Sequence, residues 1–349
     1  MNIRYYLSEL VTIPAQTMMM VLSASIILYC LYMPVHDFNP VGRESYIQQI
    51  TPKIIKTWGK EPVRVKTGLV LHEFLQFDVV KNEFLVNAVI SFEFDPHQVQ
   101  LEELDKFSFT KGDIVKKSEP LIKKISPTRT FVEYLVRIKF STLSDYSMFP
   151  LDDHRIFLNF TNTTVEAHEV IYEVHDEDFT VPEYLFLAGW EIVSRKVVSG
   201  YTQYSSQKEN VTHYPKIVFS FGIQKNDVRQ LLLIMIPLLI LFYFCVFSLS
   251  IKSFDTNVQE MFPLLTAFVA YVIVLHSLSP NVGYFMLMDY IVLFFMLAMF
   301  FICLVNFLCI MPENKLSKYT LAQIRGGTAL MVHIALTAVM FYLTRFYQG

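Results

Sequence analysis

The sequence predicts a membrane protein with an extracytoplasmic all-β sandwich and a four-helix transmembrane bundle, preceded by one N-terminal transmembrane helix. The first observation is composition: 53% of the 349 residues are hydrophobic and only 17% are charged, whereas soluble domains carry about 25% charged residues. The second observation is the uneven distribution of charge. Residues 34–226 hold 22 Lys/Arg and 26 Asp/Glu, and the other 156 residues hold 7 and 6. The middle of the chain is therefore expected in water and the rest in lipid.

Five apolar segments are long enough to cross a membrane, because a bilayer core of about 30 Å needs roughly 20 helical residues. They are residues 17–33, 228–251, 258–277, 284–311 and 328–347. The first segment could be a signal peptide, but it is long and no small-x-small cleavage site follows it, so we interpret it as a retained anchor. The loop 312–327 carries Lys315, Lys318 and Arg325 against Glu313, which places it in the cytoplasm by the positive-inside rule. We therefore expect five spans in the cell membrane, a cytoplasmic N-terminus and a large domain outside.

Four regions follow from this pattern: an N-terminal anchor (1–36), a linker with a short helix (37–61), the β-sandwich (62–226) and the four-helix bundle (227–349). Between residues 62 and 223, runs rich in β-branched and aromatic residues predict many short strands, with a hairpin turn at Lys81–Asn82. A helix is expected near residue 52, capped by Thr51 and ended by Gly59. Its inward side chains should be Ile54, Ile55 and Trp58.

Several short motifs occur in a fixed order. They are "FPLDD" at 149–153, "GWEI" at 189–192, "YPKIVFSFGIQKND" at 214–227 followed by an apolar helix with Pro237, "FDTNVQ" at 254–259 and "SPNVGYFMLMDY" at 279–290. In this order and spacing they resemble the pentameric ligand-gated ion channels. The cysteines that bracket the signature loop in animal members are absent, and Thr142 and Ile156 take their places, as in bacterial members. An extra N-terminal transmembrane helix departs from the family pattern. The resemblance covers roughly residues 60–349.

The corner at residues 149–153 acquires a role from this resemblance. It implies that the corner reaches the membrane surface and presses on the loop between the second and third helices of the bundle, where Pro150 makes the bend and Asp152 pairs with a cation. The residues assigned to this coupling are Asp78, Phe149, Pro150, Asp152, Lys225, Pro280 and Tyr284, with Arg229 as an alternative cation. From the residues alone, a strand-start turn with solvated carboxylates is equally open.

The helix that starts near Asp255 would line a pore in this family. Steps of three and four residues place one set on a single helix face: Asp255, Gln259, Pro263, Thr266, Ala270, Ile273 and Ser277. A ring of Asp255 side chains at the cytoplasmic mouth would attract cations and repel anions. Above Thr266 the face is nearly all apolar, which could gate by dewetting or remain closed.

Two weaker candidate sites lie in the soluble region. Residues 199–213 resemble the loop that caps agonists in the family, with Tyr201 and Tyr204 as its aromatic residues; mobile loop tyrosines are the alternative. The acidic stretch 168–178 could hold Ca²⁺ through Glu173, His175, Asp176 and Asp178, although a solvated acidic edge is the more common reason for such a stretch. No other cofactor is expected.

The predicted function is therefore a cation-selective channel subunit gated by a ligand, an ion or pH, which forms a homopentamer in lipid and binds an unknown small ligand or ion. The alternative is a channel-like membrane binding or scaffold protein that does not conduct. No catalytic motif suggests an enzyme, and no basic aromatic stripe suggests nucleic acid. A secondary transporter is disfavoured because the spans show no inverted repeat.

Overall fold

The computed structural model describes residues 3–36, 46–79, 81–141, 145–182, 185, 187, 189–205, 211–225, 228–251, 254–310 and 317–346. Within these ranges, side chains are not described for 3–5, 33–36, 205, 211, 228–230, 254–260, 310 and 346. The chain forms two compact units. We call them the helical unit (Met1–Asn39, Tyr146–Asp152 and Asp227–Gly349) and the strand unit (Pro40–Asp145 and Asp153–Asn226).

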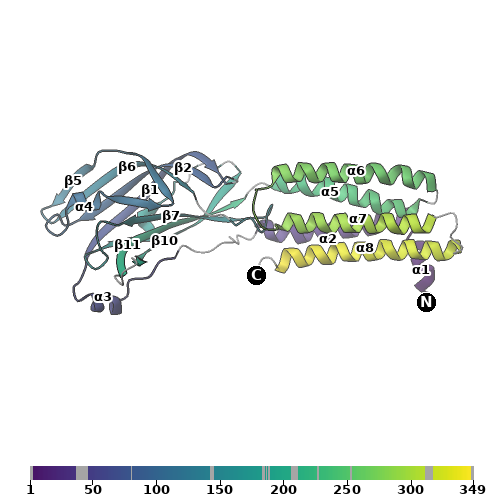
Figure 1. The fold of residues 1–349 in the computed structure, drawn as a ribbon, viewed down its shortest axis with the longest axis horizontal. Coiled ribbons are helices and arrows are strands. Elements are labelled where there is room, and N and C mark those ends of the chain that lie inside the picture. Colours follow the sequence, from purple (N-terminus) through teal and green to yellow (C-terminus); the bar gives the residue numbers. More distant parts are fainter. Residues whose placement is uncertain are drawn as a thin grey trace. The chain divides into compact units, whose positions relative to one another are not determined.

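The helical unit contains a short helix, α1 (Ile3–Glu9), and five long ones: α2 (Ile13–His36), α5 (Val228–Phe247), α6 (Phe254–Leu278), α7 (Leu287–Ile310) and α8 (Lys318–Phe346) (Figure 1). A short 3₁₀ turn, η2 (Ser248–Ser250), follows α5. All five long helices are long and apolar enough to cross a membrane. The predicted combination of a four-helix bundle and an N-terminal helix is therefore confirmed. The last helix starts ten residues before the predicted span.

The N-terminal helices pack into the bundle through specific polar contacts. In α2, the Ser23 hydroxyl lies 2.9 Å from the Tyr243 hydroxyl of α5 and 3.0 Å from Nδ1 of His333 in α8. Before α2, the Val11 carbonyl accepts a hydrogen bond from Ser250 Oγ at 2.7 Å. Buried polar groups need such partners in an apolar environment. These contacts make α2 a fifth helix of the bundle.

The strand unit is built from eleven described strands. Their bounds are β1 (Val63–Asp78), β2 (Glu83–Phe94), β3 (Phe107–Thr110), β4 (Gly112–Lys117), β5 (Leu121–Ser126), β6 (Arg129–Ser141), β7 (His154–Asn162), β8 (Val170–Glu173), β9 (Phe179–Thr180), β10 (Trp190–Ser205) and β11 (Val211–Lys225). The path runs β10-β11-β7-β3-β4-β6-β2-β1-β8, with β5 on β6 and β9 on β1. A helical turn, α4 (Leu101–Leu104), precedes β3, and a 3₁₀ turn, η1 (Asp176–Asp178), precedes β9.

The sheet folds over on itself to enclose an aromatic core. Strands distant along the path meet there: Phe74 of β1 contacts Phe221 of β11 with ring centroids 6.0 Å apart, and Phe92 of β2 contacts Phe160 of β7 at the same distance. Both Phe92 and Phe160 are fully buried. This arrangement confirms the predicted sandwich. The β1–β2 turn lies where it was predicted, with Asn82 at φ 55°.

A segment that we call the strap, residues 46–58, covers the edge strand β10. Gln48 pairs with Tyr201 through two backbone hydrogen bonds of 2.9 and 3.0 Å. The strap ends in helix α3 (Pro52–Trp58), which Gly59 terminates at φ 73°. The predicted cap is wrong in one respect, because the Thr51 side chain makes no capping hydrogen bond. The helix buries no residue fully, so the inward positions Ile54, Ile55 and Trp58 are only half-buried.

Candidate pore helix and coupling corner

The corner at residues 146–152 belongs to the helical unit, although the strands on either side of it do not. Two backbone hydrogen bonds shape it, from the Phe149 amide to the Tyr146 carbonyl at 2.9 Å and from the Leu151 amide to the Met148 carbonyl at 2.7 Å. The Phe149–Pro150 peptide bond is cis. Tyr146, Met148 and Phe149 are buried. The corner therefore presents its apolar side chains inward and leaves backbone groups available to a neighbour.

That neighbour is the start of helix α7, where the first amides of a helix lack partners within the helix. The Leu287 amide donates to the Ser147 carbonyl at 2.7 Å, and the Met288 amide donates to the Phe149 carbonyl at 3.2 Å. In return, the Tyr146 amide donates to the Tyr284 hydroxyl at 2.8 Å. The corner thus caps α7 from outside the helix.

The cap is completed from within the helix itself. Asp289 Oδ2 accepts a hydrogen bond from the Met286 amide at 2.7 Å, as an acidic residue in the first helical turn does in a capping box. Met286, Leu287 and Met288 are all buried. The corner is therefore hydrogen-bonded to a buried helix terminus and not only to a loop.

The predicted coupling residues are distributed unevenly. Phe149, Pro150, Pro280 and Tyr284 all belong to the helical unit, where the Tyr284 hydroxyl accepts the Tyr146 amide of the corner and Pro280 is buried. Asp152 is 2% exposed and Asp153 is 5% exposed, so the alternative of solvated carboxylates at this position is wrong.

The other two coupling residues lie in the strand unit. Asp78 Oδ1 accepts the Lys81 amide at 2.9 Å in the β1–β2 turn. Lys225 places its ammonium over the Trp190 ring, 5.6 Å from the centroid. Each therefore has a local structural role. The coupling assigned to them by resemblance stays a prediction.

Helix α6 carries the predicted pore face. Five of its members, Pro263, Thr266, Ala270, Ile273 and Ser277, are exposed in the single chain. Only 11% of positions 261–278 are buried, against 28–56% in the other four spans. The two buried side chains in this stretch, Phe268 and Leu275, lie about half a turn from the predicted face at 3.6 residues per turn. The helix therefore packs on its own bundle with the side opposite the predicted face.

The predicted face begins in the first turns of α6. Asp255 and Gln259 belong to α6, but their side chains lie outside the described residues. Pro263 does not interrupt the helix, which runs unbroken from Phe254 to Leu278. The Thr266 hydroxyl donates to the Phe262 carbonyl at 2.9 Å.

A tyrosine that sequence reasoning missed holds α6 against α5. Pro237 lies inside α5 and has no amide hydrogen, so the carbonyl four residues earlier, that of Leu233, loses its helical donor. The Tyr271 hydroxyl shares its one hydrogen between this carbonyl, at 3.0 Å, and the Ile234 carbonyl, at 2.8 Å. A proline in one apolar helix and a tyrosine in the next could have indicated the contact, because freed carbonyls in lipid need a donor.

The candidate aromatic residues of the capping loop occupy different environments. Tyr201 is only 5% exposed and packs between Trp58 and His213, with ring centroids at 5.8 and 5.2 Å. The alternative of two mobile loop tyrosines is therefore wrong for Tyr201. Tyr204 is half exposed and contacts Tyr214. The tip of the loop, residues 206–210, lies outside the described residues.

The acidic stretch does not assemble the predicted Ca²⁺ site. Glu173 pairs with Arg64 at 3.6 Å and Asp178 with Lys66 at 3.1 Å. Asp178 also accepts the His175 amide. Among the described residues, no three or more His, Cys, Asp or Glu side chains gather as metal ligands. The Asp176 carboxylate likewise accepts a hydrogen bond, from the Val197 amide.

Comparison with known proteins gives one informative similarity. No family model matches the chain. The chain is 22% identical over 242 residues to a protein of Gloeobacter violaceus described as a proton-gated ion channel. The match covers 64% of this chain and 66% of that protein, just under two thirds of its length. The similarity is consistent with a protein that is not an enzyme.

Proposed function

We propose that the chain is one subunit of a cation-selective ion channel of the pentameric ligand-gated type, gated by a ligand, an ion or pH through its β-sandwich. The observation that carries this proposal is the exposure of helix α6. A membrane helix that packs with one side and leaves a face with Thr266 and Ser277 uncovered requires something other than its own bundle on that face. The similarity to a proton-gated ion channel supports a water-filled pathway there.

The proposed assembly is a homopentamer, because one helix cannot enclose a pathway by itself and identical subunits close a ring by rotation. The uncovered side of α6 is wider than the predicted pore face. Phe262 and Val269 extend it on one side and Val274 and Leu278 on the other, and all four are half exposed or more. These apolar flanks suit contact with neighbouring α6 helices, while the centre of the face lines the axis.

The proposed gating movement passes through the corner. Because the corner's carbonyls bond the first amides of α7, a shift of the sandwich that moves the corner would also move the α6–α7 connection. Such a rigid-body transition between two packed states is a common switching mechanism. The proposed orientation in the cell membrane places the sandwich outside and the N-terminus in the cytoplasm, from the basic loop 312–327.

The test is electrical recording from purified protein in planar bilayers over a range of pH and Ca²⁺ concentrations. Cation-selective openings are expected, and Asp255→Ala should reduce the preference for cations. Asp255→Glu is the matched control, since it keeps the charge and should keep the selectivity. An intact oligomer that stays silent in every condition would contradict conduction and favour the scaffold alternative.

A further inference from the structure

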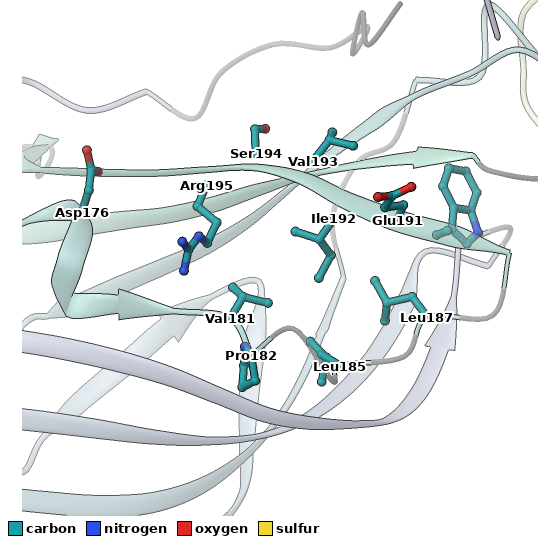
Figure 2. Close-up of a pocket in the computed structure, with 11 residues that line it drawn as sticks. Asp176, Val181, Pro182, Leu185, Leu187, Glu191, Ile192, Val193, Ser194 and Arg195 are labelled. Atoms are coloured by element: carbon teal, nitrogen blue, oxygen red, sulfur yellow. The ribbon is translucent and has the colours of Figure 1, made fainter. Parts of the chain in front are cut away.

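A hollow in the strand unit lies between the first residues of β10 and the segment that follows β9 (Figure 2). Its volume is about 780 Å³, within the range of about 300–1,000 Å³ typical of small-molecule sites. All described residues that line it come from this one chain and this one unit. None of its described lining residues belongs to the pore helix, the corner or the capping loop.

A β-bulge in β10 aims a charged side chain into this hollow. Ile192 pairs with Ile223, yet Ser194 already pairs with Gly222, so β10 carries one extra residue at this point. Because an extra residue reverses the alternation of side chains, Arg195 lies on the same side of the sheet as Ile192. Its partner in the register is Phe221, a fully buried core residue. The bulge therefore turns Arg195 toward the core side, at the rim of the sandwich.

The described residues of the opposite wall are apolar. They are Val181, Pro182, Leu185 and Leu187. Two backbone hydrogen bonds of 3.0 Å position this wall, from the Leu185 amide to the Pro182 carbonyl and from the Trp190 amide to the Leu187 carbonyl. In Figure 2, Arg195 and Ile192 project from β10 toward these side chains, whereas Ser194 projects to the other side of the strand.

Among the described residues, no acidic side chain occupies the Arg195 guanidinium. Arg195 makes no ion pair with any residue that the structure describes. The described lining residues include two acidic ones, of which Asp176 already accepts the Val197 amide through Oδ1 at 3.2 Å. Glu191 pairs with Gln224 in the register, before the bulge, and so lies on the side of the sheet away from Arg195. Among the described residues, the inner side of the hollow thus offers one cation, the solvent-exposed Arg195, beside apolar side chains.

We propose that this hollow binds a small organic carboxylate with an apolar body, such as a short aliphatic acid. The carboxylate would accept two parallel hydrogen bonds from the Arg195 guanidinium. This is the geometry in which guanidinium groups bind carboxylates most strongly. The apolar body would cover Ile192, Leu185 and Leu187. Binding itself is independent of conduction, and only its consequence, an effect on gating through β10, rests on the proposed function.

Trp190 lines the hollow and reports on binding. The chain has two tryptophans, Trp58 and Trp190, so the Trp58→Phe variant leaves one reporter at the site. In that background, titration of the full-length protein with sodium hexanoate should give a saturable change in fluorescence. Hexanol and hexylammonium should not, because neither offers a carboxylate to a guanidinium.

Substitution of the arginine decides the assignment. Arg195→Gln should weaken hexanoate binding about tenfold or more, as expected for loss of hydrogen bonds to a charged group. Arg64→Gln, an equal change at an exposed arginine outside the hollow, should leave binding unchanged. Hexanoate should also raise the unfolding temperature of the protein with both tryptophans present, which provides a reading if Trp58→Phe fails to fold. Equal affinity for hexanol, or unchanged binding by Arg195→Gln, would overturn the site.

The proposed carboxylate site and the proposed channel function can be refuted independently of each other. Absence of hexanoate binding in a protein that conducts would contradict only the carboxylate site. Hexanoate binding that depends on Arg195 in a protein that never conducts would contradict only the channel.

Discussion

The hydrogen bond that holds α6 to α5 gives the most quantitative prediction. Tyr271→Phe removes the donor to the Leu233 carbonyl, which Pro237 has already deprived of its helical amide. Intramolecular hydrogen bonds contribute about 0.5–1.5 kcal/mol, and those between membrane helices average about 0.6 kcal/mol with a maximum near 1.7. We therefore expect a loss of about 1 kcal/mol in the free energy of unfolding.

A double-mutant cycle separates this contact from other effects of the substitution. Pro237→Ala restores an amide that can donate to Leu233, so Tyr271→Phe should cost less than half as much in that background. The assay is thermal unfolding in detergent, followed by intrinsic fluorescence. A loss of 1 kcal/mol should lower the midpoint by about 2 °C for a chain of this size.

Tyr319→Phe is the control for the loss of a tyrosine hydroxyl. This residue lies at the exposed start of α8, and its hydroxyl makes no hydrogen bond among the residues described. It should leave the midpoint unchanged. If Tyr271→Phe costs the same with alanine at position 237, the freed carbonyl is not the reason for the contact and the reasoning is refuted.

Two further predictions concern the N-terminal helices and the sandwich. A Cβ atom at Gly326 would lie 1.9 Å from the Leu7 carbonyl oxygen, whereas a Cβ atom at Gly327 would meet nothing within 4 Å. Gly326→Val should therefore displace α1 and make it accessible to limited proteolysis. Gly327→Val is the control and should leave α1 protected. Burial raises the pKa of Asp105, but hydrogen bonds, chiefly from Lys117, and the charge of Lys117 outweigh burial and hold this pKa below its ordinary value. Asp105→Asn should lower the free energy of unfolding by at most about 1 kcal/mol at neutral pH. This difference from wild type should disappear as the pH falls through the lowered pKa of Asp105, because the wild-type carboxyl then also loses its charge. A difference that persists under acid conditions would contradict this assignment.

Much of the architecture could be predicted because its signals are long or strongly periodic. The five spans follow from hydropathy alone, and the β1–β2 hairpin follows from two β-rich runs around Lys81–Asn82. Strands β4 and β5 escaped prediction because they are short and rich in lysine, with sequences "GDIVKK" and "LIKKIS". Their pairing with β6 supplies the stability that their own composition does not indicate.

The sites depend more on contacts between distant segments. The corner motif predicted contact with the α6–α7 connection, but the bonds that cap α7 run through the backbone of Ser147 and Phe149, whose carbonyls carry no side-chain signal. The burial of Tyr201 depends on the strap, which is remote in sequence. The placement of Arg195 depends on a bulge, and one inserted residue leaves no trace in hydropathy.

The central claim is that copies of α6 meet around a common axis. A single-particle reconstruction of the full-length protein in lipid nanodiscs, viewed down its symmetry axis, tests it most directly. We predict five copies, with α6 innermost and Thr266, Ala270 and Ile273 facing the axis. A monomer or dimer, or an oligomer in which α6 faces lipid at the periphery, would contradict the claim.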